Sequence, residues 1–460
     1  MASDLNMGRS QALQFWLEKE RLHPAEFATI SQALNDSLAF DGSMADFEVG
    51  EGPDITDKCH RFFDWQTGRR RAGLWTFSSS LHSSPSSQSE ISLDDNSRFQ
   101  GVNLASQDYL GLSSHPLVQE AGIAAIRDFG PHSAGSGALQ GNTHLSLKLE
   151  EDLKNHLQCS AVTLFPTGWA AGFGSMSALI RPSDHVVMDQ FSHNCLVSGA
   201  TYATKNVHRF RHLSEESCRA IVSRIRKRDP RAGILVVTEG LFSMDSDVPD
   251  FGRLRSICDE YEAFLLVDIA HDLGALGPQG TGMLGEKGAL HLPDFIVGSF
   301  SKSFSSNGGF LASRRREIHQ YVKYYANSYT FSNALSPVQS AIVLEALKVI
   351  RSSEGDLLRS TLIQRVTRFR QALMEGRLPA GGSPSPIVPV DLVSAAVARL
   401  TAKLSLATGC LVNLVEYPAV SVGVGRLRLQ CMATHSEKDL DSAAKIILRS
   451  HELAAMALNL

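Results

Sequence analysis

Short apolar runs alternate with longer amphipathic stretches from about residue 100 onward. The short runs are rich in Val, Ile and Leu and cover 161–165, 184–189, 233–238, 264–268 and 295–298. Runs of this kind are typical of strands that are buried on both faces of a parallel sheet. The segment 254–263 between two of them is long enough for a crossover helix. The pattern therefore predicts a doubly wound α/β domain over residues 101–337.

A second, helix-rich region follows Pro337. Apolar residues recur at helical spacing over 338–352, and charged sequence of helical character continues to about Arg377. A cluster of Gly, Pro and Ser residues at 376–386 then marks a boundary. Beyond it, the pattern predicts strands at 386–392 and 426–432 and helices near 393–409 and 437–453. Residues 338–460 are predicted to form a smaller C-terminal α+β domain.

The first hundred residues have a different texture. Four apolar residues give 11–21 one amphipathic helical face, and the charged stretch 57–71 continues the helical pattern. The Ser-rich stretch 76–90 cannot bury much apolar surface and is predicted to be a loop or linker. Residues 1–100 are therefore predicted to be an N-terminal helical arm followed by a Ser-rich linker.

Charge and cysteine content narrow the class of protein. The 460 residues include 44 basic and 48 acidic side chains, a net charge of −4, and no long basic run, so no nucleic-acid partner is expected. No apolar stretch approaches the roughly 20 residues that span a bilayer, and the N-terminus has no apolar signal core. Seven cysteines without a C-x-x-C pair argue against a metal site or a disulfide framework. We expect a cytoplasmic protein with reduced thiols and no integral membrane span.

Polar side chains end the three strongest predicted strands. They are Glu239 with Ser243, Asp268 with His271, and Ser299 with Lys302. In an open α/β sheet, ligands bind at the carboxyl ends of the strands. An amine there can form a Schiff base with an aldehyde cofactor, and a neighbouring acid can keep a pyridinium nitrogen protonated. The residues alone also allow purely structural roles. A lysine after a strand is commonly a solvent-exposed residue at the start of a helix, and an aspartate at the end of a strand is commonly a helix cap.

Two glycine-rich stretches fall within the large predicted domain. The stretch 135–141 follows no strong strand and is therefore no dinucleotide fingerprint. It is either a loop that approaches a ligand or a set of turns. At 165–172 a strand ends, Gly168 follows and a helix begins. Backbone amides at such a helix start can hold a phosphate, although a simple β–α turn has the same pattern.

Six motifs, taken in order along the chain, resemble those of one family. They are ASQDYLGL at 105–112, FPTGW at 165–169, EGLFSMDSD at 239–247, VDIAHDLGALGPQG at 267–280, GSFSKSF at 298–304 and GRLRL at 425–429. The chain resembles the α-oxoamine synthases, the fold-type I pyridoxal-phosphate enzymes that include 8-amino-7-oxononanoate synthase, serine palmitoyltransferase and 5-aminolevulinate synthase. The resemblance covers roughly residues 100–450. It implies a fold-type I transferase with a large, mostly parallel-sheet domain and a smaller C-terminal domain.

The resemblance implies roles around the ring of the cofactor, pyridoxal 5'-phosphate. Lys302 matches the lysine that forms the Schiff base, and Asp268 matches the aspartate that pairs with the pyridine nitrogen. His193 matches the histidine that stacks on the ring. His271 and Ser243 match groups near the phenolic oxygen of the ring.

Other matched positions concern the phosphate. Gly168 and Trp169 match the turn that holds it, with Ser299 alongside. Ser332 matches a hydroxyl that reaches the phosphate bound in the partner subunit. The resemblance therefore implies a homodimer.

Two positions concern the amino-acid substrate, and two others depart from the family pattern. Arg426 matches the arginine that grips the substrate carboxylate, where a bidentate guanidinium suits the geometry. Gln107 falls where relatives often have an asparagine near the same carboxylate. Ile269 replaces an acidic residue beside Asp268, and Ser146 stands where many relatives carry a histidine. These departures, with the long N-terminal arm, leave the substrates and the pathway open.

The implied reaction is a Claisen-type condensation of an α-amino acid with an acyl thioester. Coenzyme A or an acyl-carrier protein presents the acyl group, and decarboxylation typically gives an α-amino ketone. Lys302 is expected to act as general base, with His271 and His193 orienting the reacting groups. Two alternatives stay open: an aminotransferase or aldol-type enzyme on the same fold, and a non-catalytic partner subunit.

Overall fold

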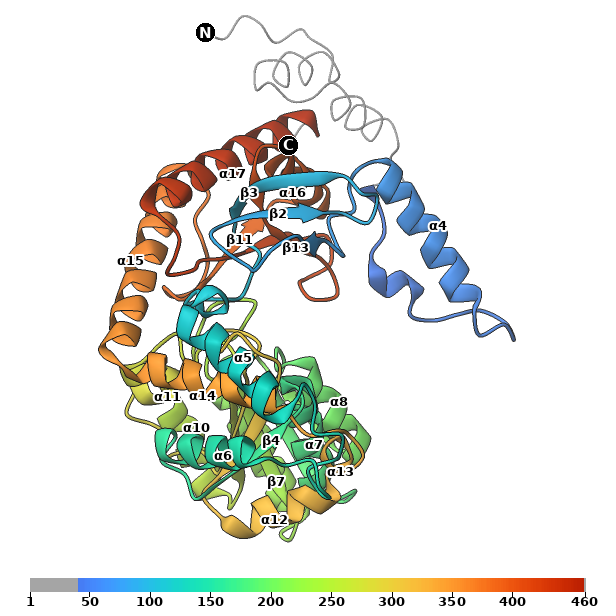
Figure 1. Cartoon of the computed structure of the whole chain (residues 1–460). Coiled ribbons are helices and arrows are strands. Elements are labelled where there is room, and N and C mark those ends of the chain that lie inside the picture. The colour runs from blue at the N-terminus through green and yellow to red at the C-terminus, as the bar shows by residue number, and fades with distance from the viewer. Residues whose placement is uncertain (1–39, 459–460) are drawn as a thin grey trace, which may run out of the picture. The chain divides into compact units, whose positions relative to one another are not determined.

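The computed structural model describes residues 40–458. The predicted helix at 11–21 lies outside this range. Within it the chain forms two compact units (Figure 1). The large unit comprises Gln107–Ser243 and Asp247–Leu362, and the small unit comprises the described residues up to Ser106, Met244–Ser246 and those from Ile363 onward. Over residues 40–458, no helix is long and apolar enough to cross a lipid bilayer.

A seven-stranded sheet forms the centre of the large unit. In spatial order its strands are β4 (Ala161–Phe165), β10 (Gly309–Ser313), β9 (Phe295–Ser299), β8 (Phe264–Asp268), β7 (Ile234–Glu239), β5 (His185–Asp189) and β6 (Val207–Phe210). β10 runs antiparallel to both of its neighbours, and the other pairs are parallel. The five predicted strands and the mostly parallel α/β sheet are confirmed.

Two strands of this sheet were not predicted. β6 lies at the sheet edge, and only Phe210 in it is buried, so it shows no continuous apolar run. β10 is buried throughout, but its sequence, Gly-Phe-Leu-Ala-Ser, contains small residues where a central strand usually has branched ones. Both strands lack the pattern by which the other five were found.

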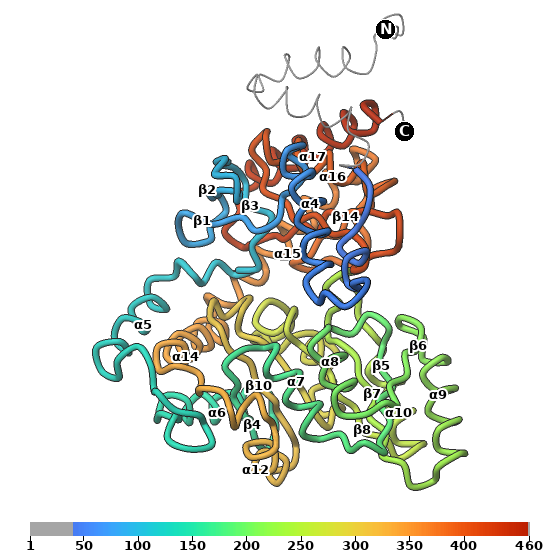
Figure 2. The backbone as a smooth tube through the Cα atoms, turned by 90° about the vertical axis from the view of Figure 1, so that its right-hand side faces the viewer, coloured from blue at the N-terminus to red at the C-terminus, as the bar shows by residue number. Residues whose placement is uncertain are grey.

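Helices surround the sheet of the large unit. They are α5 (Pro116–Phe129), α6 (His144–His156), α7 (Gly168–Leu179), α8 (Asn194–Ala203), α9 (Glu215–Arg228), α10 (Phe251–Glu260), α11 (Gly282–Glu286), α12 (Arg316–Tyr325), α13 (Asn327–Thr330) and α14 (Pro337–Arg351). α7 packs on β9 and β10, α9 on β5, and α10 on β8 (Figure 2). α10 is the predicted crossover helix. Because six strands point the same way, their carboxyl ends meet at one edge of the sheet.

The small unit contains two sheets and several helices. One sheet has the order β1 (Ser80–Leu81), β2 (Gln88–Ser92), β3 (Arg98–Asn103) and β12 (Cys410–Leu411), and the other β11 (Ile387–Leu392), β14 (Gly425–Gln430) and β13 (Asn413–Val415). The helices are α4 (Asp57–Arg71), α16 (Ala395–Ala407), α17 (Glu437–Ala457) and the C-terminal part of α15 (Ser353–Glu375). The predicted C-terminal α+β elements are confirmed.

The prediction that the Ser-rich stretch 76–90 is a loop or linker is wrong in part. β1 and the first residues of β2 lie within this stretch. β1 pairs with the end of β2, at Ile91 and Ser92, and β2 pairs along its length with β3. Ser89 is 2% exposed, and its hydroxyl oxygen accepts a hydrogen bond from Asn103 Nδ2 at 3.1 Å. Serines can be buried in a hairpin when their hydroxyls are hydrogen-bonded, and composition does not reveal such pairing.

The limits of the compact units differ from the predicted segment boundaries at 100/101 and 337/338. The large unit extends to Leu362 because α14 packs on α5 and α6. Residues 40–100, predicted to be a separate arm and linker, belong to the same compact unit as the residues from Ile363 onward, since β3 pairs with β12. Local sequence pattern finds the elements of such a unit but not the distant strand that each one pairs with.

Candidate active site

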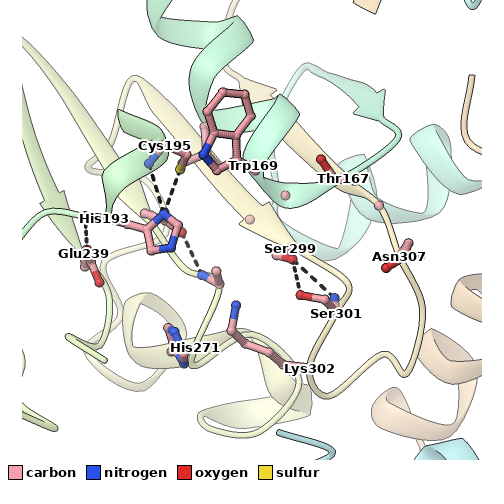
Figure 3. Close-up of a pocket in the computed structure, with 16 residues that line it drawn as sticks. Thr167, Trp169, His193, Cys195, Glu239, His271, Ser299, Ser301, Lys302 and Asn307 are labelled. Carbon is pink, nitrogen blue, oxygen red and sulfur yellow. Dashed lines mark hydrogen bonds between the residues drawn. The ribbon is translucent and has the colours of Figure 1, made fainter. Parts of the chain in front are cut away.

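A cavity of about 290 Å³ lies in the large unit, where parallel strands β4, β5, β7, β8 and β9 end. Its volume is close to the lower end of the roughly 300–1,000 Å³ typical of small-molecule sites. The lining residues are Thr167, Gly168, Trp169, His193, Cys195, Glu239, Asp268, Ala270, His271, Val297, Gly298, Ser299, Ser301, Lys302, Asn307 and Gly308 (Figure 3). The structure thus brings seven of the predicted site residues together: Gly168, Trp169, His193, Asp268, His271, Ser299 and Lys302.

Lys302 reaches the cavity from the loop after β9. Phe300 and Phe304 on either side of it are fully buried, and their rings pack edge to face with centroids 5.5 Å apart. This packing fixes the backbone around the lysine, while its half-buried side chain extends into the cavity beside His271 (Figure 3). A primary amine held in this way can act as a nucleophile or as a base.

Asp268 ends β8 and is 8% exposed. Its Oδ1 accepts a hydrogen bond from the backbone N–H of Ala270 at 2.9 Å. Burial raises the pKa of Asp268 above its usual range, and the neighbouring His193 and Lys302 offset this only in part. A buried carboxylate of this kind is stabilised by a cationic partner, such as a protonated ring nitrogen.

A second buried carboxyl, that of Glu239, lies next to Asp268 because β7 and β8 pair in register at this position. Its Oε1 accepts a hydrogen bond from the backbone N–H of His193 at 2.7 Å. Burial and the charge of Asp268 raise the pKa of Glu239 well above its usual range. Of the two neighbouring carboxyls, Glu239 is therefore the one that is protonated more readily. The Glu239 carboxyl holds the start of α8, where His193 lines the cavity.

The N-terminus of α7 forms another wall of the cavity. Thr167 caps this helix by accepting a hydrogen bond from the backbone N–H of Ala170 at 3.0 Å. A Cβ at Gly168 would lie 2.4 Å from Ser299 Oγ, so the turn has no room for a side chain. The hydroxyl oxygens of Ser299 and Ser301 are 2.8 Å apart. Free N–H groups at a helix start attract anions, and these hydroxyls add further donors.

Four predicted residues lie outside the described lining of this cavity: Gln107, Ser243, Ser332 and Arg426. Gln107 opens the large unit, and Ser243 lies in the loop after β7. Ser332 follows α13, and its neighbour Asn333 forms a bridge with Ser136. The glycine-rich stretch 135–141 therefore packs against the Ser332 segment.

The guanidinium of Arg426 is engaged within the small unit. Arg426 on β14 stands opposite Asp391 on β11, and its Nε and Nη2 donate to the two carboxylate oxygens of Asp391 at 2.5 and 3.1 Å. Its Nη1 donates to the Asp245 carboxylate at 3.0 Å and to the backbone oxygen of Met244. Two carboxylates of the chain itself thus occupy the arginine that was predicted to hold the substrate carboxylate.

Sequence reasoning did not single out several residues of this site. Tyr109 is fully buried, and its hydroxyl lies 3.0 Å from His271 Nδ1, so it fixes the orientation of that imidazole. It belongs to the motif at 105–112, but it lies 162 residues before His271 and no spacing links the two. Cys195 Sγ lies 3.0 Å from His193 Nδ1, and burial raises the pKa of this thiol. It is therefore a neutral thiol rather than a nucleophilic thiolate.

The fold defines the class of protein. A serine palmitoyltransferase of Sphingomonas wittichii matches 88% of this chain and 99% of its own, with a TM-score of 0.81 and 26% identity. A serine palmitoyltransferase structure with PLP matches 88% of this chain and 100% of its own, with a TM-score of 0.82 and 25% identity. The predicted fold-type I transferase fold is confirmed.

The family follows from the sequence comparisons. The aminotransferase class I and II family matches residues 100–447. 8-Amino-7-oxononanoate synthase of Geotalea daltonii is 34% identical over 344 residues, which cover 75% of this chain and 87% of the relative. Serine palmitoyltransferase of Sphingobacterium spiritivorum is 32% identical over 344 residues, 75% of this chain and 85% of the relative.

The chain therefore belongs to the aminotransferase class I and II family, among the α-oxoamine synthases. The predicted resemblance is confirmed. At the level of that family, the predicted pyridoxal-phosphate-dependent C-acyltransferase is confirmed as well. The roles of individual residues stay predictions.

Proposed function

We propose that this chain condenses an α-amino acid with an acyl thioester as a pyridoxal-phosphate-dependent C-acyltransferase. The observation that carries the proposal is the meeting of Lys302, Asp268 and the N-terminus of α7 in one cavity. The thioester is that of coenzyme A or of an acyl-carrier protein. Loss of carbon dioxide from the condensed product leaves an α-amino ketone.

The walls of the cavity suit pyridoxal phosphate in their chemistry. The turn at Gly168, which has no room for a side chain, and the helix start behind it would hold the phosphate, with Trp169 and Ser299 alongside. Asp268 would face the ring nitrogen, and His193 would stack on the ring. His271 and Ser243 would lie near the phenolic oxygen. When bound, the cofactor supplies a protonated ring that accepts electron density from the substrate α-carbon.

The residues of the chain supply the proton transfers and the orientation. The Lys302 amine would remove the α-proton of the amino acid as general base. The Asp268 carboxylate would keep a proton on the ring nitrogen, because an opposite charge stabilises a buried ion. His271, oriented by Tyr109, would position the reacting groups. Arg426 and Gln107 are proposed to bind the amino-acid carboxylate.

Product analysis tests this proposal. The purified protein with pyridoxal phosphate is incubated with a matrix of amino acids and acyl thioesters, and products are identified by mass spectrometry while free thiol is measured. We expect an α-amino ketone and one released thiol per turnover for at least one pair. Keto-acid formation without thiol release would contradict the proposal and support an aminotransferase.

We also propose a homodimer in which Ser332 reaches the phosphate site of the partner subunit. Two apolar side chains near Ser332 in the sequence or in the segment packed against it face solvent: Phe331 is 84% exposed, and Leu139, in the stretch that packs against this segment, is 83% exposed. Exposed apolar groups that gather in this way mark protein interfaces. Two-fold pairing is also the commonest assembly of soluble proteins.

Subunit mixing tests the shared site. Lys302→Ala and Ser332→Ala chains are each expected to be impaired, and co-refolding them should restore part of the activity. The reason is that one site of the mixed dimer regains both groups. A fully active monomer in sedimentation, or mixed chains that recover no activity, would contradict the shared site.

A cytoplasmic location is proposed from the thiols. All seven cysteines are free, and five of them are buried. Free thiols persist in reducing compartments. Secretion of the native protein with its thiols oxidised would contradict this location.

A further inference from the structure

One half-buried histidine of the large unit has an ionic environment that the proposed reaction does not use. His212 follows β6, and its side chain is 14% exposed. Its Nδ1 lies 2.8 Å from Asp189 Oδ1, and its Nε2 lies 3.0 Å from Asp247 Oδ2. Carboxylate oxygens only accept hydrogen bonds, so both ring nitrogens must donate. His212 is therefore an imidazolium held between two carboxylates.

The first carboxylate belongs to the loop that carries His193. Asp189 ends β5 and is fully buried. Its Oδ1 also accepts a hydrogen bond from the backbone N–H of Phe191 at 2.9 Å, and its Oδ2 accepts one from that of Leu213 at 2.9 Å. The backbone oxygen of Asp189 accepts a further bond from Ser192 N–H at 3.0 Å. Asp189 thus shapes the turn that leads directly to His193.

The second carboxylate belongs to the loop that carries Ser243. Asp247 closes that loop, because its backbone oxygen accepts a hydrogen bond from the N–H of Phe242 at 3.0 Å. Asp247 Oδ1 is buried and has no hydrogen-bond partner among residues 40–458. The hydrogen bond from His212 Nε2 to Asp247 Oδ2 therefore stabilises the charge of this carboxylate. Phe242, 1% exposed, packs edge to face on the His212 ring, with centroids 4.6 Å apart.

We propose that His212 is a positioning residue for the cofactor: its imidazolium ties the loop of His193 to the loop of Ser243. The inference rests on the proposed function, in which His193 stacks on the ring and Ser243 lies near its phenolic oxygen. His212 itself lies outside the described cavity lining. It acts through the two loops, whose separation it sets.

The charges around His212 make this tie dependent on pH. Burial lowers the pKa of His212, but its hydrogen bonds to Asp189 and Asp247 raise it to about 10. On α9, burial and the charge of Asp189 raise the pKa of the Cys218 thiol to about 12, so this thiol stays neutral. Because the pKa of His212 is higher in the folded protein than in the unfolded chain, its bonds to the two carboxylates stabilise the fold fully below the unfolded pKa of about 6.5. This stabilisation is lost as the pH rises through about 10.

Cofactor binding to the apoenzyme gives the first test. Pyridoxal phosphate is titrated into wild type, His212→Gln and the matched control His208→Gln, and binding is followed by visible circular dichroism. His208 is on the neighbouring strand β6, but it pairs with His185 at 2.9 Å and with neither loop. We expect His212→Gln to bind about tenfold more weakly, the effect of losing one charged hydrogen bond, with an altered dichroic band. We expect His208→Gln to bind like the wild type.

Asp247→Asn gives a second test that does not depend on replacing His212. An asparagine can accept from the imidazolium and donate to the neutral imidazole, so the tie no longer requires the proton. The wild-type dichroic band should change as the pH rises through about 10, and the part of that change due to His212 should be absent in Asp247→Asn.

Two outcomes would overturn the inference, provided that the wild type binds pyridoxal phosphate. One is that His212→Gln binds it equally well with the same band. The other is that Asp247→Asn keeps the full alkaline change. A wild type that binds no pyridoxal phosphate would instead overturn the proposed function on which the inference rests.

Discussion

The cavity of the large unit and the surroundings of Arg426 in the small unit are built in different ways. In the cavity, Lys302 and Asp268 come from the ends of neighbouring parallel strands and face a shared space. Arg426 lies on an antiparallel strand, where Asp391 on the next strand and Asp245 take up its guanidinium. The groups of the cavity face open space, whereas Arg426 would have to exchange a carboxylate of the chain for that of a substrate in order to bind it. A motif match is thus stronger evidence for a functional role when the matched side chain also lines a cavity.

The largest effect is expected from Lys302→Ala. Turnover should fall by several orders of magnitude, because the nucleophile and the general base are lost together. Pyridoxal phosphate should still bind through the helix start of α7. The measurement is thiol release under saturating substrates, with Lys323→Ala as control, since Lys323 pairs with Glu150 outside the cavity lining. A Lys302→Ala enzyme that keeps most of its turnover would break the account of the cavity.

A smaller but still large effect is expected from Arg426→Ala. If Arg426 holds the substrate carboxylate, kcat/KM for the amino acid should fall about 30- to 1000-fold, the effect of losing a charged bidentate contact. The KM for the thioester should change far less. Arg426→Lys should rescue little, because an ammonium cannot reproduce the planar fork. Amino-acid use within a few-fold of wild type in Arg426→Ala would mean that the ion pairs with Asp391 and Asp245 are the whole role of this residue.

The smallest effect, and the one that most sharpens the comparison, is expected from Asp391→Asn. The side chain of Asp391 is 58% exposed, and an ion pair so open to solvent contributes only about 0–1 kcal/mol. Removing this competitor should lower the KM for the amino acid by up to about fivefold. The matched control is Asp441→Asn, which removes the exposed bidentate partner of Arg368 in the same unit. A KM that rises, or that stays the same as in the control, would show that Asp391 does not compete with the substrate.

Sequence pattern predicted the strands of the cavity well. The runs at 161–165 and 264–268 coincide with β4 and β8, because a strand buried along most of its length is apolar at most positions. The residues that close these strands then follow from the geometry of a parallel sheet. For this reason the sequence alone is enough to place Asp268, Ser299 and Lys302 on one rim.

The remaining features depend on contacts between distant parts of the chain. Tyr109 meets His271 across 162 residues, and Asp391 meets Arg426 across 35. Each depends on which strands and loops lie side by side, and local periodicity carries no information on that. The hairpin of β1 and β2 was missed for the same reason, since buried serines require partners that lie outside the run.

The covalent attachment of the cofactor tests the central claim most directly. The holoenzyme is reduced with borohydride, digested, and its labelled peptide is identified by mass spectrometry. The structure predicts that the label lies on Lys302, in the peptide that contains Phe300 and Phe304. A label on any other lysine, or a holoenzyme that takes up no label, would contradict the assignment of this cavity as the cofactor site.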